Sequence, residues 1–154
     1  MTPAIRLLKK QNISFNTHQY EHDAASKSYG EEAAQKLGIA QERVFKTLVV
    51  QSEKSLAVGV VPVSKMLSLK VMAKALGVKK VAMADAKDVE NATGYILGGV
   101  SPFGQKKRLK VVLDSSALNY DTIFVSAGKR GLEVELSPTV FEKILSAKFE
   151  EIAN

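Results

Sequence analysis

The chain contains no cysteine and no tryptophan, and its 154 residues include only two histidines, His18 and His22. Without cysteine it can form no disulfide, no thiolate nucleophile of its own and no cysteine-ligated zinc or iron–sulfur centre. The two histidines do not stand in the H-E-x-x-H arrangement of a helical zinc site. We therefore expect neither a bound metal nor any other cofactor.

Long apolar runs are also missing. The most apolar segments, such as residues 58–63, are much shorter than the roughly 20 residues that a helix needs to cross a bilayer. The first residues lead quickly to Arg6, Lys9 and Lys10 and do not resemble a signal peptide. These absences predict a cytoplasmic protein without a membrane segment.

Aromatic residues make up only 6% of the chain, which argues against a surface that stacks the bases of single strands. Basic residues outnumber acidic ones by 22 to 16, and the resulting net charge of +6 favours an acidic partner. Two basic clusters stand out, one at Lys106, Lys107 and Arg108 and the other at Lys129 and Arg130. Each cluster is either a solvated surface or a contact to nucleic acid, in which case phosphate contacts should dominate.

A chain of this length, without linker or repeat, predicts one domain over residues 1–154. Cap and turn residues predict helices over residues 3–11, from a Ser28–Glu31 capping box to Gly38, from Ser68 to Gly77, from Asp85 to Gly94 and after Ser137–Pro138. Strands are predicted near residues 14–20, 44–50, 56–63, 80–84, 95–99, 109–114, 122–126 and 132–136, with a hairpin turn at 52–55. Because helices and strands do not alternate regularly, we expect an α+β fold: a curved, barrel-like, largely antiparallel mixed sheet partly wrapped by helices.

Lys46 is unusual because it falls among aliphatic residues on one face of the predicted strand 44–50. Alternate side chains of a strand point to opposite faces, so Lys46 shares its face with Val44, Leu48 and Val50. An unpaired buried ammonium group is costly. Lys46 therefore either reaches a pocket or extends to solvent from an edge strand.

A glycine-rich segment, Gly98-Gly99-Val100-Ser101-Pro102-Phe103-Gly104-Gln105-Lys106, is the second unusual feature. It is not a P-loop, because the lysine comes one position late and the hydroxyl residue that binds magnesium is missing. The two adjacent glycines indicate either a bulge in a strand or a backbone that a ligand can approach closely. Pro102 would stiffen the turn that follows.

Hydroxyl and aromatic residues outside that segment allow simpler interpretations. Ser101 and Ser126 are by default turn or strand-end hydroxyls, and neither has a histidine nearby in the sequence to suggest a catalytic triad. Tyr20 and Tyr29 are by default packing residues.

Several segments together resemble the YbaK family, which is related to the editing insertion domain of bacterial prolyl-tRNA synthetases. The resemblance rests on Phe45-Lys46-Thr47-Leu48, on the glycine-rich segment and on Val125-Ser126-Ala127-Gly128-Lys129-Arg130-Gly131-Leu132. Thr2-Pro3-Ala4-Ile5 and His18-Gln19-Tyr20-Glu21-His22-Asp23 also fit, so the resemblance covers essentially the whole chain.

The resemblance implies trans-editing. In this reaction the ester bond of Cys-tRNA(Pro), which prolyl-tRNA synthetase forms by mistake, is hydrolysed. The family's functional lysine falls on Lys46. Its glycine-rich loop falls on Gly98, Gly99, Ser101 and Pro102, and its pocket residues fall on Tyr20, Tyr29, Thr47, Ser126, Gly128 and Glu133. The chain departs from the family pattern at Ala127, where relatives carry a glycine.

The mechanism implied by the resemblance uses the substrate's own thiol, which attacks the ester carbonyl and releases the tRNA. Backbone amides of the glycine loop would then stabilise the oxyanion, and Lys46 would orient the substrate. The two basic clusters would contact the tRNA backbone, and prolyl-tRNA synthetase would be a partner. Two alternatives stay open: a deacylase for another mischarged tRNA such as Ala-tRNA(Pro), or a non-catalytic module that binds tRNA or a synthetase.

Overall fold

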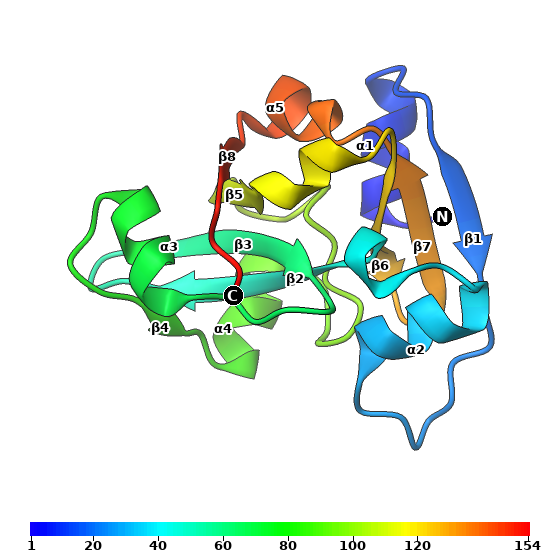
Figure 1. The fold of residues 1–154 in the computed structure, drawn as a ribbon, viewed down its shortest axis with the longest axis horizontal. Coiled ribbons are helices and arrows are strands. Elements are labelled where there is room, and N and C mark those ends of the chain that lie inside the picture. Colours follow the sequence, from blue (N-terminus) through cyan, green and yellow to red (C-terminus); the bar gives the residue numbers. More distant parts are fainter.

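The computed structural model describes residues 1–154, in which helices surround two β-sheets (Figure 1). The α-helices are α1 (Pro3–Lys10), α2 (Tyr29–Leu37), α3 (Leu69–Leu76), α4 (Ala86–Thr93) and α5 (Thr139–Leu145). The strands are β1 (Asn16–Gln19), β2 (Phe45–Gln51), β3 (Leu56–Pro62), β4 (Ala82–Met83), β5 (Lys110–Asp114), β6 (Ile123–Lys129), β7 (Leu132–Leu136) and β8 (Lys148–Glu150). Two 3₁₀ helices, η1 (Gln41–Arg43) and η2 (Ser115–Asn119), complete the set.

The strands form a three-stranded sheet in the order β1-β7-β6 and a five-stranded sheet in the order β4-β2-β3-β5-β8. Four strand pairings are antiparallel, whereas β3–β5 and β5–β8 are parallel. A single parallel bridge between Val44 and Phe124 joins β6 to the residue that precedes β2. The predicted α+β class and largely antiparallel pairing are confirmed, with the strands divided between two sheets that do not close into a barrel.

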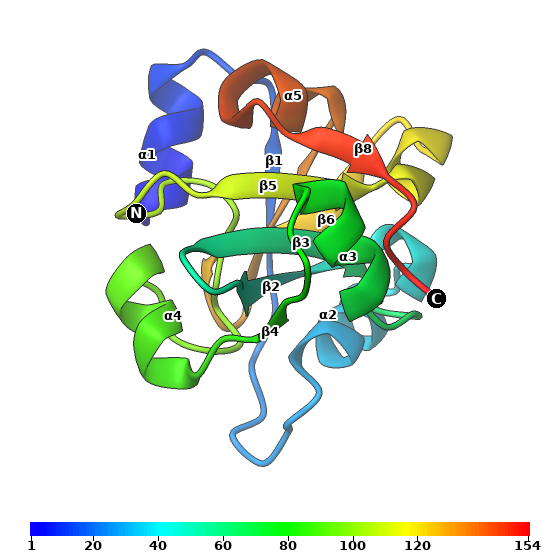
Figure 2. The ribbon, with the colours of Figure 1, turned by 90° about the vertical axis from the view of Figure 1, so that its left-hand side faces the viewer.

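The two faces of the five-stranded sheet carry different cores. Figure 2 shows α3 in front of this sheet, and Met72 of that helix packs with Val50, Val61 and Val112. The opposite face shares a larger core with the three-stranded sheet, α1, α4 and α5. Because neighbouring strand residues alternate between these faces, Phe45 and Val49 lie in the large core. Both sheets are thereby fixed around β2, which carries Lys46.

Helix ends largely follow the predicted cap residues. Ser68 and Asp85 accept hydrogen bonds from the backbone amides three residues later, as N-caps do. Gly38, Gly77 and Gly94 end α2, α3 and α4 in the left-handed conformation that glycine adopts most readily. These local signals determine where α2 and α4, which flank the loops described below, begin and end.

Two local predictions are wrong. Residues 95–99 form a turn instead of a strand, with Gly98 at φ +85° and the Gly99 amide bonded to the Ile96 carbonyl. The Ser28 side chain makes no capping hydrogen bond, because Ser28 has φ −102° and ψ 75°. Strand β8 was not predicted from the sequence at all. No helix in the structure combines the length and the apolar character that crossing a membrane requires.

Candidate functional site

A cavity of about 390 Å³ opens beside β2. Its other walls come from the loop between β1 and α2, from Val63 after β3, from the turn after α4, and from the adjacent strands β6 and β7. Its lining residues are Tyr20, Lys27, Ser28, Tyr29, Gly30, Glu31, Val44, Phe45, Lys46, Thr47, Leu48, Val63, Leu97, Gly98, Val100, Ser126 and Glu133.

Strand β2 presents an open edge in this region. Strand β4 pairs only with Val50 and Gln51, and the bridge to β6 is made at Val44. Between these points β2 has a strand partner on one side only, β3. Consecutive residues can therefore line the cavity although their side chains point to opposite faces of the sheet. The Thr47 hydroxyl is buried there without a hydrogen-bond partner, and such a group is costly unless a ligand satisfies it.

Lys46 is half-buried at the cavity wall, which is one of the two positions that the sequence pattern allowed. Burial lowers its pKa, and the negative charge of Glu31 partly opposes that shift. None of the ion pairs in the structure involves Lys46. The ammonium group can therefore donate hydrogen bonds to a substrate in the cavity.

Glu133 places a second ionisable group on the cavity wall, opposite Ser126 in the β6–β7 ladder. Burial raises the pKa of Glu133 to about 8, so the carboxyl group is largely protonated at neutral pH and can donate a hydrogen bond. Tyr20 is nearby, and burial together with the Glu133 charge raises its pKa to about 12. The Ser126 hydroxyl accepts a hydrogen bond from the Gly128 amide over 3.2 Å. This wall is therefore polar but uncharged near neutral pH.

The glycine-rich segment supplies only part of the cavity surface. Gly98 lines the cavity, and its backbone N–H is absent from the hydrogen bonds of the structure. Gly99 and Pro102 are buried behind it, and a Cβ on Gly99 would lie 2.8 Å from the Lys129 Cα. The fully buried Ser101 hydroxyl accepts a hydrogen bond from the Phe103 amide. Gly98 is thus the member of the predicted set that a substrate can reach, and the others support the loop.

Gly128 also supports the site from behind. It has φ +109°, and a Cβ at this position would lie 2.8 Å from the Tyr95 ring. The neighbouring Ala127 is fully buried, and its carbonyl accepts a hydrogen bond from the Thr2 hydroxyl over 2.5 Å. The departure from the family pattern at Ala127 is therefore accommodated in the core and does not reach the cavity.

The predicted basic residues lie in two places. Lys106, Lys107 and Arg108 are exposed beyond the end of α4, and the first two donate backbone hydrogen bonds to that helix. Lys129 is exposed at the end of β6. Arg130 differs, because its guanidinium group bonds to the Leu97 carbonyl and lies over the Tyr29 ring. The structure therefore brings Arg130 to the cavity wall formed by the 97–98 turn, whereas neither Lys129 nor the first cluster lines the cavity.

One cluster that the sequence analysis missed holds the loop before α2. The buried Glu32 carboxylate accepts hydrogen bonds from His22 Nδ1 and the Asp23 amide, both over 2.7 Å, and pairs with Lys36 over 3.1 Å. Burial alone would raise the pKa of Glu32, but these hydrogen bonds outweigh it and lower the pKa to about 2. The His22 ring lies 5.7 Å from the Tyr29 ring. Histidine and glutamate ten residues apart gave no signal in the sequence, because only the fold brings them together.

Histidine, aspartate and glutamate side chains do not gather in groups of three that could hold a metal ion. The cavity instead combines the half-buried Lys46, an unpaired hydroxyl, a neutral carboxyl group and a free backbone amide. Such a set can bind and polarise an ester and stabilise an oxyanion. It contains no nucleophile that is activated by an adjacent base.

Comparison with known proteins gives three consistent findings. The profile of the family described as "Aminoacyl-tRNA editing domain" matches residues 23–144. The "Putative Cys-tRNA(Pro)/Cys-tRNA(Cys) deacylase EbsC" of Enterococcus faecalis is 40% identical over 152 residues, which cover 98% of this chain and 92% of that protein.

Two crystal structures share the fold. A "putative trans-editing enzyme for prolyl tRNA synthetase" has a TM-score of 0.84 and 22% identity, covering 100% of this chain and 99% of that one. The "hypothetical protein APE2540" has a TM-score of 0.89 and 23% identity, covering 99% of this chain and 100% of that one. At these identities the two structures support the fold alone.

Proposed function

This chain belongs to the family of aminoacyl-tRNA editing domains, and from that premise we propose that it deacylates mischarged Cys-tRNA(Pro). The observation that carries the proposal is the meeting of Lys46 and Gly98 on one cavity. A relative that is 40% identical over nearly the whole chain is named for deacylation of Cys-tRNA(Pro) and Cys-tRNA(Cys). The proposed substrate therefore fits both the chemistry of the cavity and the name of this relative.

The cavity suits an aminoacyl ester held at the end of a tRNA. In this proposal Lys46 donates hydrogen bonds to the terminal ribose or to the aminoacyl group, and the Gly98 amide, which is unbonded in a residue that lines the cavity, donates to the oxyanion. One good oxyanion donor contributes roughly 3–4 kcal/mol to a transition state of this kind. Thr47 and the neutral Glu133 provide further hydrogen bonds for orientation.

The nucleophile in this proposal is the thiol of the cysteinyl group. The chain has no cysteine of its own, and its cavity contains no activated serine. The thiol sulfur forms a bond to the ester carbonyl carbon, the bond from that carbon to the ribose oxygen breaks, and the thiol proton passes to the ribose oxygen. The protein contributes mainly orientation and oxyanion stabilisation. Selectivity then follows from the thiol as well as from pocket size, which discriminates weakly between small side chains.

A panel of charged tRNA(Pro) substrates tests both the activity and this mechanism. We expect the protein to deacylate Cys-tRNA(Pro) at least about 100-fold faster than Ala-tRNA(Pro) or Ser-tRNA(Pro), since neither of these carries a thiol. tRNA(Pro) carrying S-methylcysteine should be equally resistant, because its sulfur cannot lose a proton. The measurement is the rate at which labelled amino acid is released from each substrate.

The same panel separates the proposal from its alternatives. Equal rates on the cysteinyl and S-methylcysteinyl substrates would rule out attack by the thiol while leaving the deacylase in place. Preferential release of alanine would identify the alternative substrate Ala-tRNA(Pro). Binding of tRNA without release of any amino acid would favour a non-catalytic module.

We identify no element of this chain that would distinguish tRNA(Pro) from other tRNAs, so prolyl-tRNA synthetase is the proposed partner. The exposed basic cluster at Lys106, Lys107 and Arg108 contacts the tRNA backbone in this proposal. Adding the synthetase should then increase the preference for tRNA(Pro) over tRNA(Cys), measured with both tRNAs carrying cysteine. An unchanged preference would mean that the synthetase does not supply the selectivity for tRNA(Pro).

A further inference from the structure

Arg130 is attached to the cavity wall by its guanidinium group. Its Nε and Nη2 atoms donate hydrogen bonds to the Leu97 carbonyl over 2.9 and 2.7 Å. The same guanidinium group lies over the Tyr29 ring, 4.6 Å from the ring centre. Both Leu97 and Tyr29 line the cavity, so one side chain connects two of its walls.

The ends of the turn that Arg130 holds are fixed, because Tyr95 is buried and hydrogen-bonded to Thr93 and Phe103, and Gly99 is buried. Between them there is less support: the Gly99 amide bonds to the Ile96 carbonyl, and Ile96 and Leu97 are 53% and 46% exposed. Turns with few buried contacts and exposed backbone open easily. The Gly98 amide, which is the proposed oxyanion donor, therefore owes its position largely to the bond between Arg130 and Leu97.

The contact of Arg130 with Tyr29 leaves room only for glycine at position 98. A Cβ at this position would lie 2.8 Å from both the Arg130 Nε and the Tyr29 Cδ2. The residue also has φ +85°, which side chains rarely tolerate. The glycine is therefore required so that Arg130 and Tyr29 can close over the turn, in addition to any approach by a ligand.

We propose that Arg130 is a positioning residue, which fixes the 97–98 turn and the Tyr29 ring against the cavity and does not bind the tRNA backbone. The inference rests on the proposed function, because the positioned amide serves the deacylation step. The sequence assigns Arg130 to the tRNA backbone because it belongs to a basic cluster, and this inference replaces that role. Lys129, which is exposed beside it, is still free for phosphate contact.

Replacement by lysine separates the two roles. Lysine keeps the positive charge but cannot form two parallel hydrogen bonds to one carbonyl or stack as a plane on a ring. A residue that binds phosphate should tolerate Arg130→Lys, whereas a positioning residue should not. Misplacement by about 1 Å can reduce a rate by roughly 100-fold, so we expect both Arg130→Lys and Arg130→Ala to lower kcat at least about 10-fold on Cys-tRNA(Pro).

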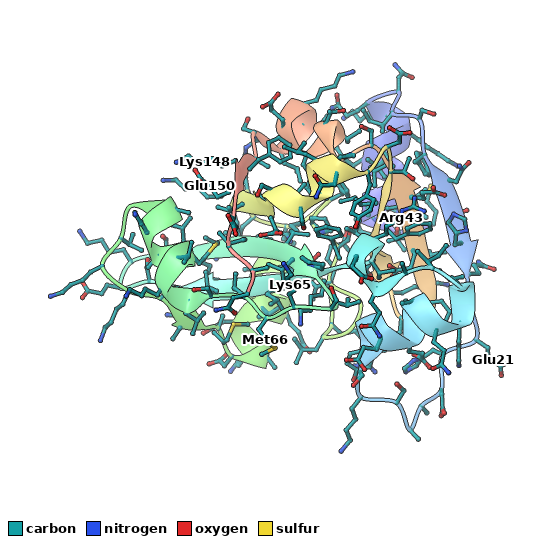
Figure 3. The ribbon with its side chains drawn as sticks, viewed as in Figure 1. Glu21, Arg43, Lys65, Met66, Lys148 and Glu150 are labelled. Carbon is teal, nitrogen blue, oxygen red and sulfur yellow. The ribbon has the colours of Figure 1, made fainter.

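Arg43 offers a matched control away from the cavity. Its Nε and Nη2 atoms donate to the Thr122 carbonyl, and its guanidinium group lies 5.2 Å from the centre of the Phe124 ring. Figure 3 labels this side chain, which comes from η1. Arg43 also bonds to the Thr122 hydroxyl and pairs with Glu135 over 3.5 Å. Arg43→Lys breaks a two-bond contact to a carbonyl like that of Arg130, so it should lower the melting temperature while leaving kcat close to the wild-type value.

Two further measurements complete the test. Affinity for uncharged tRNA(Pro), followed over a range of salt concentrations, should be almost unchanged in Arg130→Lys and Arg130→Ala. Amide hydrogen exchange at Gly99, measured without substrate, should be faster in both variants and unchanged in Arg43→Lys. If Arg130→Ala does not fold, Arg130→Lys and the exchange measurement decide the matter.

Several results would overturn the inference. One is a wild-type kcat in Arg130→Lys together with weaker, less salt-dependent tRNA binding in Arg130→Ala, which is the signature of a lost phosphate contact. Another is unchanged Gly99 exchange in both variants. If the wild-type protein deacylates no substrate, the proposed function fails, and the Gly99 exchange alone still decides whether Arg130 holds the turn.

Discussion

At the scale of single residues, the cavity is defined by polar groups that the rest of the protein leaves unsatisfied. Lys46 has no acidic partner, the Thr47 hydroxyl has no hydrogen-bond partner, and Glu133 is buried without a nearby cation. Each of these groups reduces the stability of the free protein. We interpret them as groups whose partners arrive with the substrate.

For Glu133, this loss of stability can be measured through the pH dependence of unfolding. Its pKa is raised from an ordinary value of 4.5 to about 8 in the folded protein, so the folded state holds this proton more tightly than the unfolded state does. The free energy of unfolding should therefore fall as the pH rises from about 4.5 to about 8. Glu133→Gln removes that loss, and we expect it to raise the melting temperature at pH 8 by about 3 °C or more, corresponding to roughly 1 kcal/mol.

The control for this prediction lies two residues further along β7. Hydrogen bonds from Thr122 and His18 lower the pKa of Glu135, with burial opposing them. Glu135→Gln should therefore destabilise the protein at neutral pH, and the difference from wild type should shrink in acid. If Glu133→Gln had the same effect at pH 4 and pH 8, the raised pKa would be wrong.

At the scale of elements, the short motifs were predictable, but the contacts between distant segments were not. The glycines that end α2, α3 and α4 and the hairpin turn after β2 depend on neighbouring residues, and the sequence pattern located them. Residues 95–99 have the apolar and aromatic character of a strand, yet they form a turn because Gly98 takes a positive φ and Arg130 holds the Leu97 carbonyl. Neither cause can be deduced from residues 95–99 alone.

The loop before α2 gives a second test at this scale. Glu32→Gln keeps the shape of the side chain but removes the charge that His22, Asp23 and Lys36 satisfy. We expect it to lower the free energy of unfolding at pH 7 by about 1–3 kcal/mol. Because the pKa of Glu32 is lowered from 4.5 to about 2 in the folded protein, that difference should shrink as the pH falls below about 4.5. Urea unfolding at pH 7 and at pH 3 measures it.

Glu31→Gln is the matched control on the same helix, because Glu31 is exposed and takes part in no ion pair. It should leave stability almost unchanged at both pH values. A loss in Glu31→Gln as large as that in Glu32→Gln would mean that the buried cluster does not hold the loop.

At the scale of the whole molecule, the site exists because two sheets meet at β2. The sequence pattern correctly placed Lys46 on a strand, but it could not show that β2 has an open edge between its contacts with β6 and β4. Figure 1 shows the three-stranded sheet and α2 on one side of this meeting point and the larger sheet on the other. Both the cavity and the closure of its wall by Arg130 follow from that arrangement.

The central claim is that Lys46 at this open edge acts on an aminoacyl-tRNA ester, and one comparison tests it most directly. Single-turnover deacylation of Cys-tRNA(Pro) is measured with wild type, Lys46→Ala and Lys65→Ala. Lys65 serves as the control because it is an exposed lysine in the loop between β3 and α3 (Figure 3). We expect Lys46→Ala to reduce the rate at least about 100-fold, the scale of a lost transition-state donor, with melting temperature unchanged or raised. Lys65→Ala should match wild type. Undiminished deacylation by a folded Lys46→Ala protein would contradict the account.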